Sequence, residues 1–342
     1  MNYLITGGSG FIGSHLVENL LKSGHSVINI DNFDNFYDYR IKIRNTLDST
    51  GHTSSFKFTN KEDDINLVIN TSKSENYKLY YQDIRDKDGL KTIFKNHKID
   101  FIIHLAALAG VRPSIENPLD YEAVNIRGTQ NLWELCKEFG IHKFIYASSS
   151  SVYGNSDKVP FSETDNVDRP ISPYAATKKA GELLGHVYHH LYNIDMIHLR
   201  FFTVYGPRQR PDLAIHKFTK LILDDDEIPF YGNGSTARDY TYIDDIIDGI
   251  LKSVLYLESR EKVFEIINLG ENEVITLAEM LSELEKVLGK SANKKILPMQ
   301  AGDVLKTNAD VTKAKTLIGY EPTTNFQNGI KIFVEWFLRN NN

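Results

Sequence analysis

The chain has 342 residues, of which 41% are hydrophobic and 25% are charged, and its formal net charge at pH 7 is -6. This composition is typical of a folded globular enzyme and excludes a disordered or collagen-like chain. The negative charge disfavours nucleic acid or an anionic membrane as the main partner. A single cysteine, Cys136, excludes an internal disulfide and a cysteine-based zinc site. We therefore expect a soluble cytoplasmic protein that holds no metal and does not bind a membrane.

Residues 1–200 alternate between short apolar strands and amphipathic helices. Strands that are apolar throughout have both faces covered, as in a parallel sheet assembled from βαβ units. The predicted strands cover residues 3–5, 27–30, 79–81, 101–104, 144–147 and 195–199, and the predicted helices cover residues 11–22, 87–95, 121–139 and 175–191. This pattern predicts an α/β fold in which residues 1–200 form a domain with a Rossmann-type, doubly wound parallel sheet.

Two regions depart from this alternation. Residues 52–78 are polar and are predicted to form a surface insertion in the first domain. Beyond Gly206 the pattern becomes irregular, and the predicted helices cover residues 244–257, 277–288 and 329–338. We expect residues 201–342 to form a smaller mixed α/β lobe, with some segments returning to the first domain. Such a lobe would close over the edge of the sheet where open α/β folds bind ligands.

A glycine-rich segment, TGGSGFIG, joins the first predicted strand to the first predicted helix. Gly7 permits a tight turn, Gly10 lets the backbone approach a pyrophosphate, and Gly13 lets the helix pack closely on the strand. The N-terminus of that helix presents free N–H groups to the anion. Asp31 ends the second strand, where its carboxylate accepts hydrogen bonds from an adenosine ribose and repels a 2′-phosphate. The segment therefore predicts a dinucleotide site that takes NAD rather than NADP, and it makes residues 1–200 the predicted NAD-binding domain.

Asp83 and Ile84 follow the third predicted strand. At the sheet edge that carries the glycine-rich segment, they could bracket the adenine of a dinucleotide. An aspartate after a strand is also a common helix cap. Both interpretations stay open from the sequence.

Tyr174 and Lys178 lie four residues apart on a predicted helix, which places a phenol and an ammonium on one face. The pKa of an unperturbed tyrosine is about 10, so forming its phenolate near pH 7 costs about 4 kcal/mol. A nearby lysine cation and a positively charged nicotinamide ring both lower this cost. The serine run 148–151 follows the fifth predicted strand, where a hydroxyl can hold a sugar oxygen while Tyr174 takes its proton. These residues form the predicted chemical centre.

Longer motifs carry a resemblance to a known family. They are TGGSGFIGSHL at 6–16, HLAALAGVRPS at 104–114, YASSSSVYG at 146–154, YAATKKAGE at 174–182, RFFTVYGPRQRPD at 200–212 and RDYTYIDD at 238–245. The chain resembles the extended short-chain dehydrogenase/reductases, and within them the NAD-dependent nucleotide-sugar 4-epimerases. The resemblance spans nearly the whole chain apart from residues 52–78.

The resemblance implies roles for individual residues. Tyr174 would be the catalytic base, Lys178 would lower its pKa and bind the nicotinamide ribose, and Ser149 would be the third catalytic residue. Residues 201–342 would mainly bind the nucleotide sugar, a UDP-sugar with its diphosphate near Arg238 and its uridine ribose near Asp303. Two helices pair across a dimer in this family, so a homodimer is implied. The glycine-rich segment already predicts NAD contacts at Gly7, Gly10 and Gly13. The resemblance adds Phe11, Ile12, Asp31, Asn32, Asp83, Ile84, Leu105, Ala106, Ala107, Asn125, Tyr174 and Lys178.

The serine run distinguishes between reactions that share oxidation at C4 of the sugar. Dehydratases of this group have an Asp-Glu pair where Ser150 and Ser151 stand, and UDP-glucuronate decarboxylases have a glutamate at the position of Ser151. Without these carboxylates the 4-keto intermediate has no acid or base to take it onward. It can turn in the site and take the hydride back on its other face, which is 4-epimerisation. Decarboxylation and a non-catalytic NAD-binding role are the less favoured alternatives.

The identity of the sugar depends most on residues 200–212. They resemble the UDP-glucuronate 4-epimerases, since UDP-glucose enzymes usually have Asn at the position of Thr203. Ser150, Ser151 and Thr203 could hold a C6 carboxylate through charge-assisted hydrogen bonds. Arg112 and Arg210 are further candidates near the sugar or the diphosphate. The predicted reaction converts UDP-glucuronate to UDP-galacturonate for surface polysaccharide, with UDP-glucose or UDP-N-acetylglucosamine as the alternative substrate.

Overall fold

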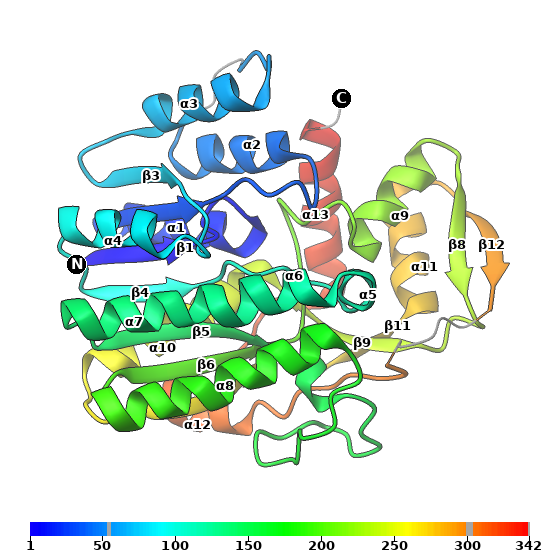
Figure 1. Cartoon of the computed structure of the whole chain (residues 1–342). Coiled ribbons are helices and arrows are strands. Elements are labelled where there is room, and N and C mark those ends of the chain that lie inside the picture. Colours follow the sequence, from blue (N-terminus) through cyan, green and yellow to red (C-terminus); the bar gives the residue numbers. More distant parts are fainter. Residues whose placement is uncertain (53–55, 299–303, 341–342) are drawn as a thin grey trace. The chain divides into compact units, whose positions relative to one another are not determined.

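The computed structural model describes residues 1–52, 56–298 and 304–340. Their packing divides the chain into two compact units (Figure 1). The first unit contains Met1–Ser148, Ser172–Leu199 and Ser253–Ile266, and the second contains Ser149–Ile171, Arg200–Lys252 and Ile267–Asn342. Among the described residues, none of the helices combines the length and the apolar character that a membrane span requires.

A seven-stranded sheet forms the framework of the first unit. Its strand order is β10-β6-β5-β4-β1-β2-β3, and the pairs β1–β2, β1–β4, β2–β3 and β4–β5 are parallel. The strands are β1 (Asn2–Thr6), β2 (Ser26–Asp31), β3 (Tyr77–Tyr81), β4 (Phe101–His104), β5 (Lys143–Ser149), β6 (Asp195–Phe201) and β10 (Phe264–Leu269). The predicted Rossmann-type parallel sheet is confirmed.

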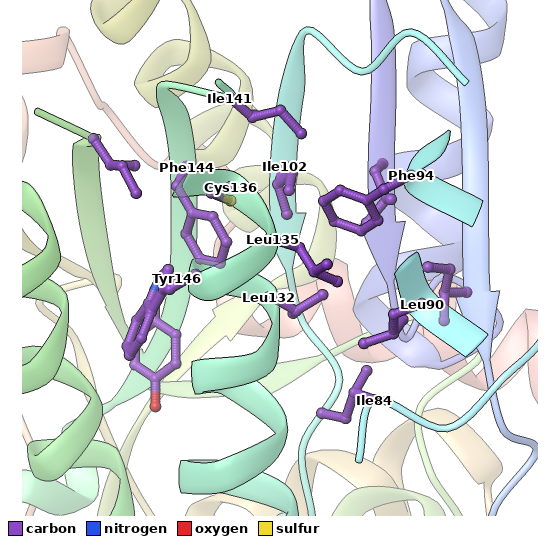
Figure 2. Packing of buried hydrophobic residues seen from close by; sticks show 14 of the residues in the cluster. Ile84, Leu90, Phe94, Ile102, Leu132, Leu135, Cys136, Ile141, Phe144 and Tyr146 are labelled. Carbon is purple, nitrogen blue, oxygen red and sulfur yellow. The ribbon is translucent and has the colours of Figure 1, made fainter. Parts of the chain in front are cut away.

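Helices cover both faces of this sheet. Figure 2 shows the core on one face, where Leu90 and Phe94 of α4 and Leu132 of α7 pack on Ile102 and Phe144 of the sheet. On the other face the Tyr3 hydroxyl donates to Glu258 of α10 at 3.0 Å. The helical segments are α1 (Phe11–Lys22), α2 (Tyr39–Ser49), α3 (Lys61–Ser72), α4 (Lys87–Asn96), α5 (Val111–Glu116), α6 (Pro118–Glu122), the π-helix η1 (Ala123–Gly128), α7 (Thr129–Phe139), α8 (Pro173–Tyr192) and, from Ser253 onward, the end of α10 (Ile243–Glu258).

The second unit has two small sheets, as expected for a mixed α/β lobe. β9 (Ala237–Tyr242) pairs with β7 (Thr203–Tyr205) in parallel and with β11 (Val274–Thr276) in antiparallel orientation. β8 (Glu227–Tyr231) and β12 (Asn293–Leu297) form a separate parallel pair. The helical segments are the 3-10 helix η2 (Ser150–Tyr153), α9 (Ala214–Leu223), α11 (Leu277–Leu288), α12 (Thr312–Ile318) and α13 (Phe326–Asn340).

Several segments differ in detail from the predicted elements. The helix expected over residues 121–139 is helical throughout, but it begins with α6 and contains the π-helix η1 before α7. The helices α2, α5, α9 and α12 had no counterpart in the prediction. Within residues 52–78, α3 buries Ile65 and Val68, so this polar segment also contributes apolar contacts.

Candidate functional site

The glycine-rich segment forms a tight turn from β1 into α1. Gly7 adopts φ 73°, and its N–H donates to the Ile30 carbonyl oxygen at 2.7 Å. A Cβ on Gly13 would lie 2.1 Å from the Gly7 carbonyl oxygen, so only glycine permits this packing. Gly10 is the N-cap of α1 and offers no side chain to its first turn. The helix N-terminus has no side-chain cap and therefore fits the pyrophosphate of a dinucleotide.

Ser9, inside this segment, is held by side chains of α2. Thr46 donates to the Ser9 hydroxyl at 2.9 Å, and the amide of Asn45 donates to the Ser9 carbonyl at 3.3 Å. Asn29 of β2 donates to the same hydroxyl at 3.1 Å. Sequence analysis missed this support, although Asp38, which caps α2 by accepting from Arg40, marks a helix start.

Asp31 lies at the end of β2 and is nearly fully buried. Its carboxylate accepts from the backbone N–H of Phe33 at 2.8 Å and of Ser9 at 3.2 Å. The ammonium of Lys42 lies 3.3 Å from Asp31 Oδ1. A carboxylate offers about four acceptor positions, so Asp31 retains capacity for a ribose hydroxyl. The buried Lys42 is a cation beside this position that the sequence pattern did not reveal.

Asn32 and Asp83 bring the ends of β2 and β3 together. The Asn32 amide donates to Asp83 Oδ2 at 2.9 Å, and Arg85 donates to both carboxylate oxygens. Partial burial alone would raise the pKa of Asp83, but the hydrogen bonds from Arg85 and Asn32 lower it to about 2. Asp83 is therefore an anion at neutral pH. Ile84, the next residue, is buried.

The loop after β4 is tied to the glycine-rich strand β1. The N–H of Leu105 donates to the Thr6 carbonyl at 3.1 Å, and the N–H of Ala106 donates to Thr6 Oγ1 at 3.2 Å. His104 bridges Thr6 Oγ1 at 2.6 Å and Thr129 Oγ1 at 2.8 Å. Burial, with a smaller contribution from the Lys178 charge, lowers the pKa of His104 to about 3, so its ring is neutral. Leu105, Ala106 and Ala107 therefore follow a fixed strand end.

Asn125 lies in the π-helix η1 and is almost completely buried. Its side chain makes two hydrogen bonds with the backbone of Leu108, each 2.9 Å long. The same amide donates to Thr177 Oγ1 of α8 at 3.1 Å. Asn125 therefore joins the loop after β4 to the helix that carries Tyr174 and Lys178. A π-turn commonly occurs at a functional site.

Tyr174 and Lys178 lie one turn apart near the start of α8. The ammonium of Lys178 donates to the Ala147 carbonyl at 2.7 Å, 5.1 Å from the centroid of the Tyr146 ring and 5.9 Å from that of Tyr174. Burial lowers the pKa of Lys178 to about 7. The Tyr121 ring meets Tyr174 edge to face, with centroids 6.2 Å apart. A phenol beside a buried amine is an arrangement suited to proton transfer.

The serine hydroxyls at the end of β5 interact with each other. The Ser149 oxygen caps η2 by accepting from the N–H of Ser151 at 3.2 Å, and it accepts from the Ser151 hydroxyl at 3.0 Å. Ser150 and Thr203 are partly exposed, and Thr203 begins β7, paired with Tyr240 of β9. All four hydroxyl residues belong to the second unit.

The predicted arginine contacts are distributed over both units. Arg238 of β9 donates to the Ala237 carbonyl at 2.9 Å. Arg210 makes two hydrogen bonds with the carboxylate of Asp212, at 2.9 and 2.7 Å. Arg112 is exposed on α5 in the first unit. Asp303, the predicted uridine contact, lies outside the described residues.

The candidate residues thus form two sets. All predicted NAD contacts, with Tyr174 and Lys178, lie in the first unit, whereas the predicted sugar contacts that the structure describes, other than Arg112, fall in the second. Within the described ranges no group of three or more His, Cys, Asp or Glu side chains is arranged to hold a metal ion.

Comparisons with known proteins agree with this geometry. The chain is 43% identical over 339 residues to the UDP-glucuronate 4-epimerase of Thermodesulfobacterium geofontis, covering 99% of this chain and 96% of that protein. The crystal structure of UDP-glucuronic acid 4-epimerase from Bacillus cereus in complex with UDP-glucuronic acid and NAD has a TM-score of 0.86 and 37% identity over 99% of both chains. UDP-glucose 4-epimerase from Thermotoga maritima, with UDP-glucose, has a TM-score of 0.83 and 32% identity over 99% of both chains.

A family model gives the same assignment over most of the chain. The model described as the NAD dependent epimerase/dehydratase family matches residues 3–270. That range contains the glycine-rich segment, the serine run and the Tyr174–Lys178 pair. The chain belongs to the NAD dependent epimerase/dehydratase family.

Proposed function

We propose that this chain is an NAD-dependent isomerase that converts UDP-glucuronate to UDP-galacturonate by inverting C4 of the sugar. The observation that carries the proposal is the Tyr174–Lys178 pair on α8, together with serines at positions 150 and 151, where the dehydratases and decarboxylases have acidic residues. Two relatives that match this chain over nearly its full length are named UDP-glucuronate 4-epimerases, and both are more similar to it in sequence than the UDP-glucose 4-epimerase of Thermotoga maritima. A site with a base for C4 and none for elimination favours return of the hydride.

The cofactor is NAD, and the first unit supplies the residues proposed to hold it. The α1 N-terminus would meet the pyrophosphate, and Asp31 would accept from the adenosine ribose. Phe11, Ile12, Asn32 and the loop 105–107 are proposed as further contacts. When bound, NAD supplies the hydride chemistry by accepting hydrogen from C4 of the sugar and returning it.

Tyr174 is proposed to take the proton of the C4 hydroxyl and later to give it back. Lys178 assists because a cation beside the phenol stabilises its ionised form. The ammonium is fixed by the Ala147 carbonyl, so it cannot drift from this position without losing that hydrogen bond. Ser149 is proposed to hold the same sugar oxygen through its hydroxyl.

The remaining hydroxyls are proposed to bind the C6 carboxylate of glucuronate. Ser150, Ser151 and Thr203 offer donors of the charge-assisted kind that carboxylates accept. Arg112, Arg210, Arg238 and Asp303 are proposed to bind the rest of the nucleotide sugar. Ser150, Ser151 and Thr203 are neutral, so they would not repel the C6 carboxylate. The dehydratases and decarboxylases have acidic residues at Ser150 or Ser151.

The test is product analysis with the purified chain and three substrates in parallel. UDP-glucuronate, UDP-glucose and UDP-N-acetylglucosamine are incubated separately and the products are separated by chromatography. The proposal predicts UDP-galacturonate as the main product and the highest kcat/KM for UDP-glucuronate. Higher kcat/KM for UDP-glucose would support the activity of the Thermotoga maritima relative instead. Release of CO2 with UDP-pentose as the main product would reject epimerisation.

We also propose that the chain forms a homodimer through α8. Leu183, Val187 and Leu191 repeat every four residues on this helix and are 59%, 45% and 57% exposed. Such an apolar stripe on one helix face fits pairing with the same face of a second copy. Light scattering would give twice the chain mass for the native protein and a single chain mass for Val187→Glu. A monomeric native protein would contradict this proposal.

The cellular setting is proposed from the chemistry of the reactants. NAD and UDP-sugars are cytoplasmic nucleotides, so a cytoplasmic location is proposed and cell fractionation would test it. UDP-galacturonate is an activated sugar, and a glycosyl transfer into polysaccharide is the class of reaction that would consume it. Deletion of the encoding gene should remove galacturonate from the surface polysaccharide.

A further inference from the structure

A buried hydrogen-bond network holds the last residue of η2 within the second unit. The Tyr153 hydroxyl donates to Asn268 Oδ1 at 2.7 Å, and Arg200 donates to the Tyr153 oxygen at 2.9 Å. The guanidinium carbon of Arg200 also lies 4.8 Å from the centroid of the Tyr153 ring. Tyr153, Arg200 and Asn268 are only 4%, 1% and 0% exposed. Burying a guanidinium and an amide is costly unless their hydrogen bonds are made, so this arrangement is tightly constrained.

The network is anchored on both sides. Asn268 donates from its amide to the Phe161 carbonyl at 2.9 Å, and its N–H donates to Glu163 Oε1 at 2.8 Å. The Phe161 ring stacks on Tyr153 with centroids 4.7 Å apart. The position of the Tyr153 hydroxyl is therefore set by its polar contacts with Arg200 and Asn268, while its ring packs in an apolar cluster.

The same network connects the hydroxyls that are proposed to bind the C6 carboxylate. Tyr153 follows Ser151 by two residues in η2, and Arg200 precedes Thr203 by three residues where β6 leads into β7. A hydrogen bond between Tyr153 and Arg200 therefore fixes the serine run relative to the strand that carries Thr203. Because hydrogen bonds to a carboxylate depend on donor position, this spacing determines how that group is oriented.

We propose that Tyr153 and Arg200 are positioning residues that hold the C6 carboxylate of the 4-keto intermediate in an orientation from which CO2 does not leave. This inference rests on the proposed function. The intermediate is a β-keto acid. Loss of CO2 breaks its C5–C6 bond, the electron pair passes into the enolate of the C4 ketone, and C5 then takes a proton from water. The product would be a UDP-4-keto-pentose, which retains no C6.

The bond between C5 and C6 breaks most readily when it is aligned with the π system of the ketone. Donors that rotate the carboxylate-bearing carbon away from this alignment slow the reaction without any change in the base or the cofactor. Spacing errors of about 1 Å suffice to weaken such positioning. The ratio of decarboxylated product to UDP-galacturonate therefore reports the positioning directly. It does not depend on how much of the protein is active.

The test compares Tyr153→Phe with the native chain, and uses Phe161→Leu as the matched control. Tyr153→Phe keeps the stacked ring and removes the hydroxyl that joins Arg200 to Asn268. Phe161→Leu disturbs the same apolar cluster and leaves that hydroxyl in place. With UDP-glucuronate, Tyr153→Phe should raise the ratio of UDP-4-keto-pentose to UDP-galacturonate by about five-fold, the effect of one hydrogen bond. Phe161→Leu should lower Tm with an unchanged product ratio.

A second measurement covers the case in which Tyr153→Phe is poorly folded. Thr203→Val removes one proposed donor directly, and Tyr153→Phe is then combined with it. If Tyr153 acts through the position of that donor, the double variant should change the logarithm of the ratio by less than the sum of the two single changes. Full additivity would contradict the inference. So would an unchanged ratio in folded Tyr153→Phe protein, or an equal rise in Phe161→Leu. A native chain that forms no UDP-galacturonate at all would overturn the proposed function itself, and the inference with it.

Discussion

The Lys178 ammonium donates a 2.7 Å hydrogen bond to the Ala147 carbonyl, which joins α8 to the end of β5. One turn further along α8, Glu182 accepts from the Ser148 hydroxyl at 2.7 Å. Two consecutive residues of β5 are thereby bonded to two side chains of α8 that are four residues apart. This attachment fixes the helix that carries Tyr174, and it places the serine run directly after a rigid strand end.

Lys178→Met should change the pH dependence of stability in a specific direction. Burial lowers the pKa of Lys178 from 10.5 to about 7. The unfolded chain keeps the proton up to the higher value, so the native lysine destabilises the fold fully below about pH 7, and the penalty disappears as pH rises toward 10.5. Lys178→Met should therefore be more stable than the native chain at pH 6, by an amount on the order of a few kcal/mol. Denaturant titrations at pH 6 and pH 9 should show this gap narrowing at the higher pH. If the difference in unfolding free energy between the two proteins widened with pH, the lowered pKa of Lys178 would be contradicted.

Tyr174→Phe should lose turnover while it keeps the fold and the cofactor. Removing a general base costs about 10²- to 10⁴-fold in kcat. Tyr121→Phe is the matched control, because its hydroxyl donates to the Ala109 carbonyl and its ring packs against Tyr174. The control should retain kcat within a few-fold. Chromatographic rates together with the NAD content of each purified variant would check both expectations, and comparable kcat values for the two variants would exclude Tyr174 as the base.

Asp31→Asn should weaken NAD binding and relax discrimination against NADP. The variant loses the charge that repels a 2′-phosphate, while the cation of Lys42 stays beside it. Loss of a charged hydrogen bond predicts about 10- to 100-fold weaker NAD binding. Titration of cofactor-stripped protein with NAD and NADP measures both affinities. The control Asp34→Asn removes a carboxylate that accepts from the N–H of Phe36, and it should leave the preference for NAD over NADP unchanged. If Asp31→Asn still excludes NADP fully, Asp31 does not set this preference.

His104→Gln should reduce the loss of stability in acid. Burial lowers the pKa of His104 from 6.5 to about 3. The unfolded chain takes up a proton below pH 6.5 and the folded chain does not, so the native protein loses stability as pH falls from 6.5 toward 3. Removing the ring should decrease the slope of unfolding free energy against pH by up to about 1.4 kcal/mol per unit in that range. Equal slopes for the two proteins would show that His104 titrates normally.

The sequence was informative wherever local chemistry decides the structure. The helix predicted over residues 11–22 matches α1, because a glycine turn and regular apolar spacing define both of its ends. The helix predicted over residues 121–139 is present, but its π-turn at Asn125 was not predicted, because the extra residue of a π-turn leaves no mark on apolar periodicity. The helix α2 was missed because polar residues interrupt its apolar spacing. Lys42, Asn45 and Thr46 are buried beside Ile43 and Leu47 and make hydrogen bonds to Ser9 and Asp31.

The supporting contacts of the candidate site could not be predicted from residue spacing. Tyr153 and Asn268 are 115 residues apart in sequence, and Ser148 and Glu182 are 34 apart. Which distant side chains meet is decided by the order of strands in the sheet, and no local motif encodes that order. The roles of Ser149, Thr203 and the arginines still rest on the resemblance and stay predictions.

The most direct test of the central claim is the fate of deuterium placed at C4 of UDP-glucuronate. If hydride leaves C4 and returns to the same carbon from the other face, the UDP-galacturonate formed in ordinary water should carry nearly all of its deuterium at C4 by mass spectrometry and NMR. Product with hydrogen from the solvent at C4 would contradict the account, because it would require proton removal at carbon in place of hydride transfer.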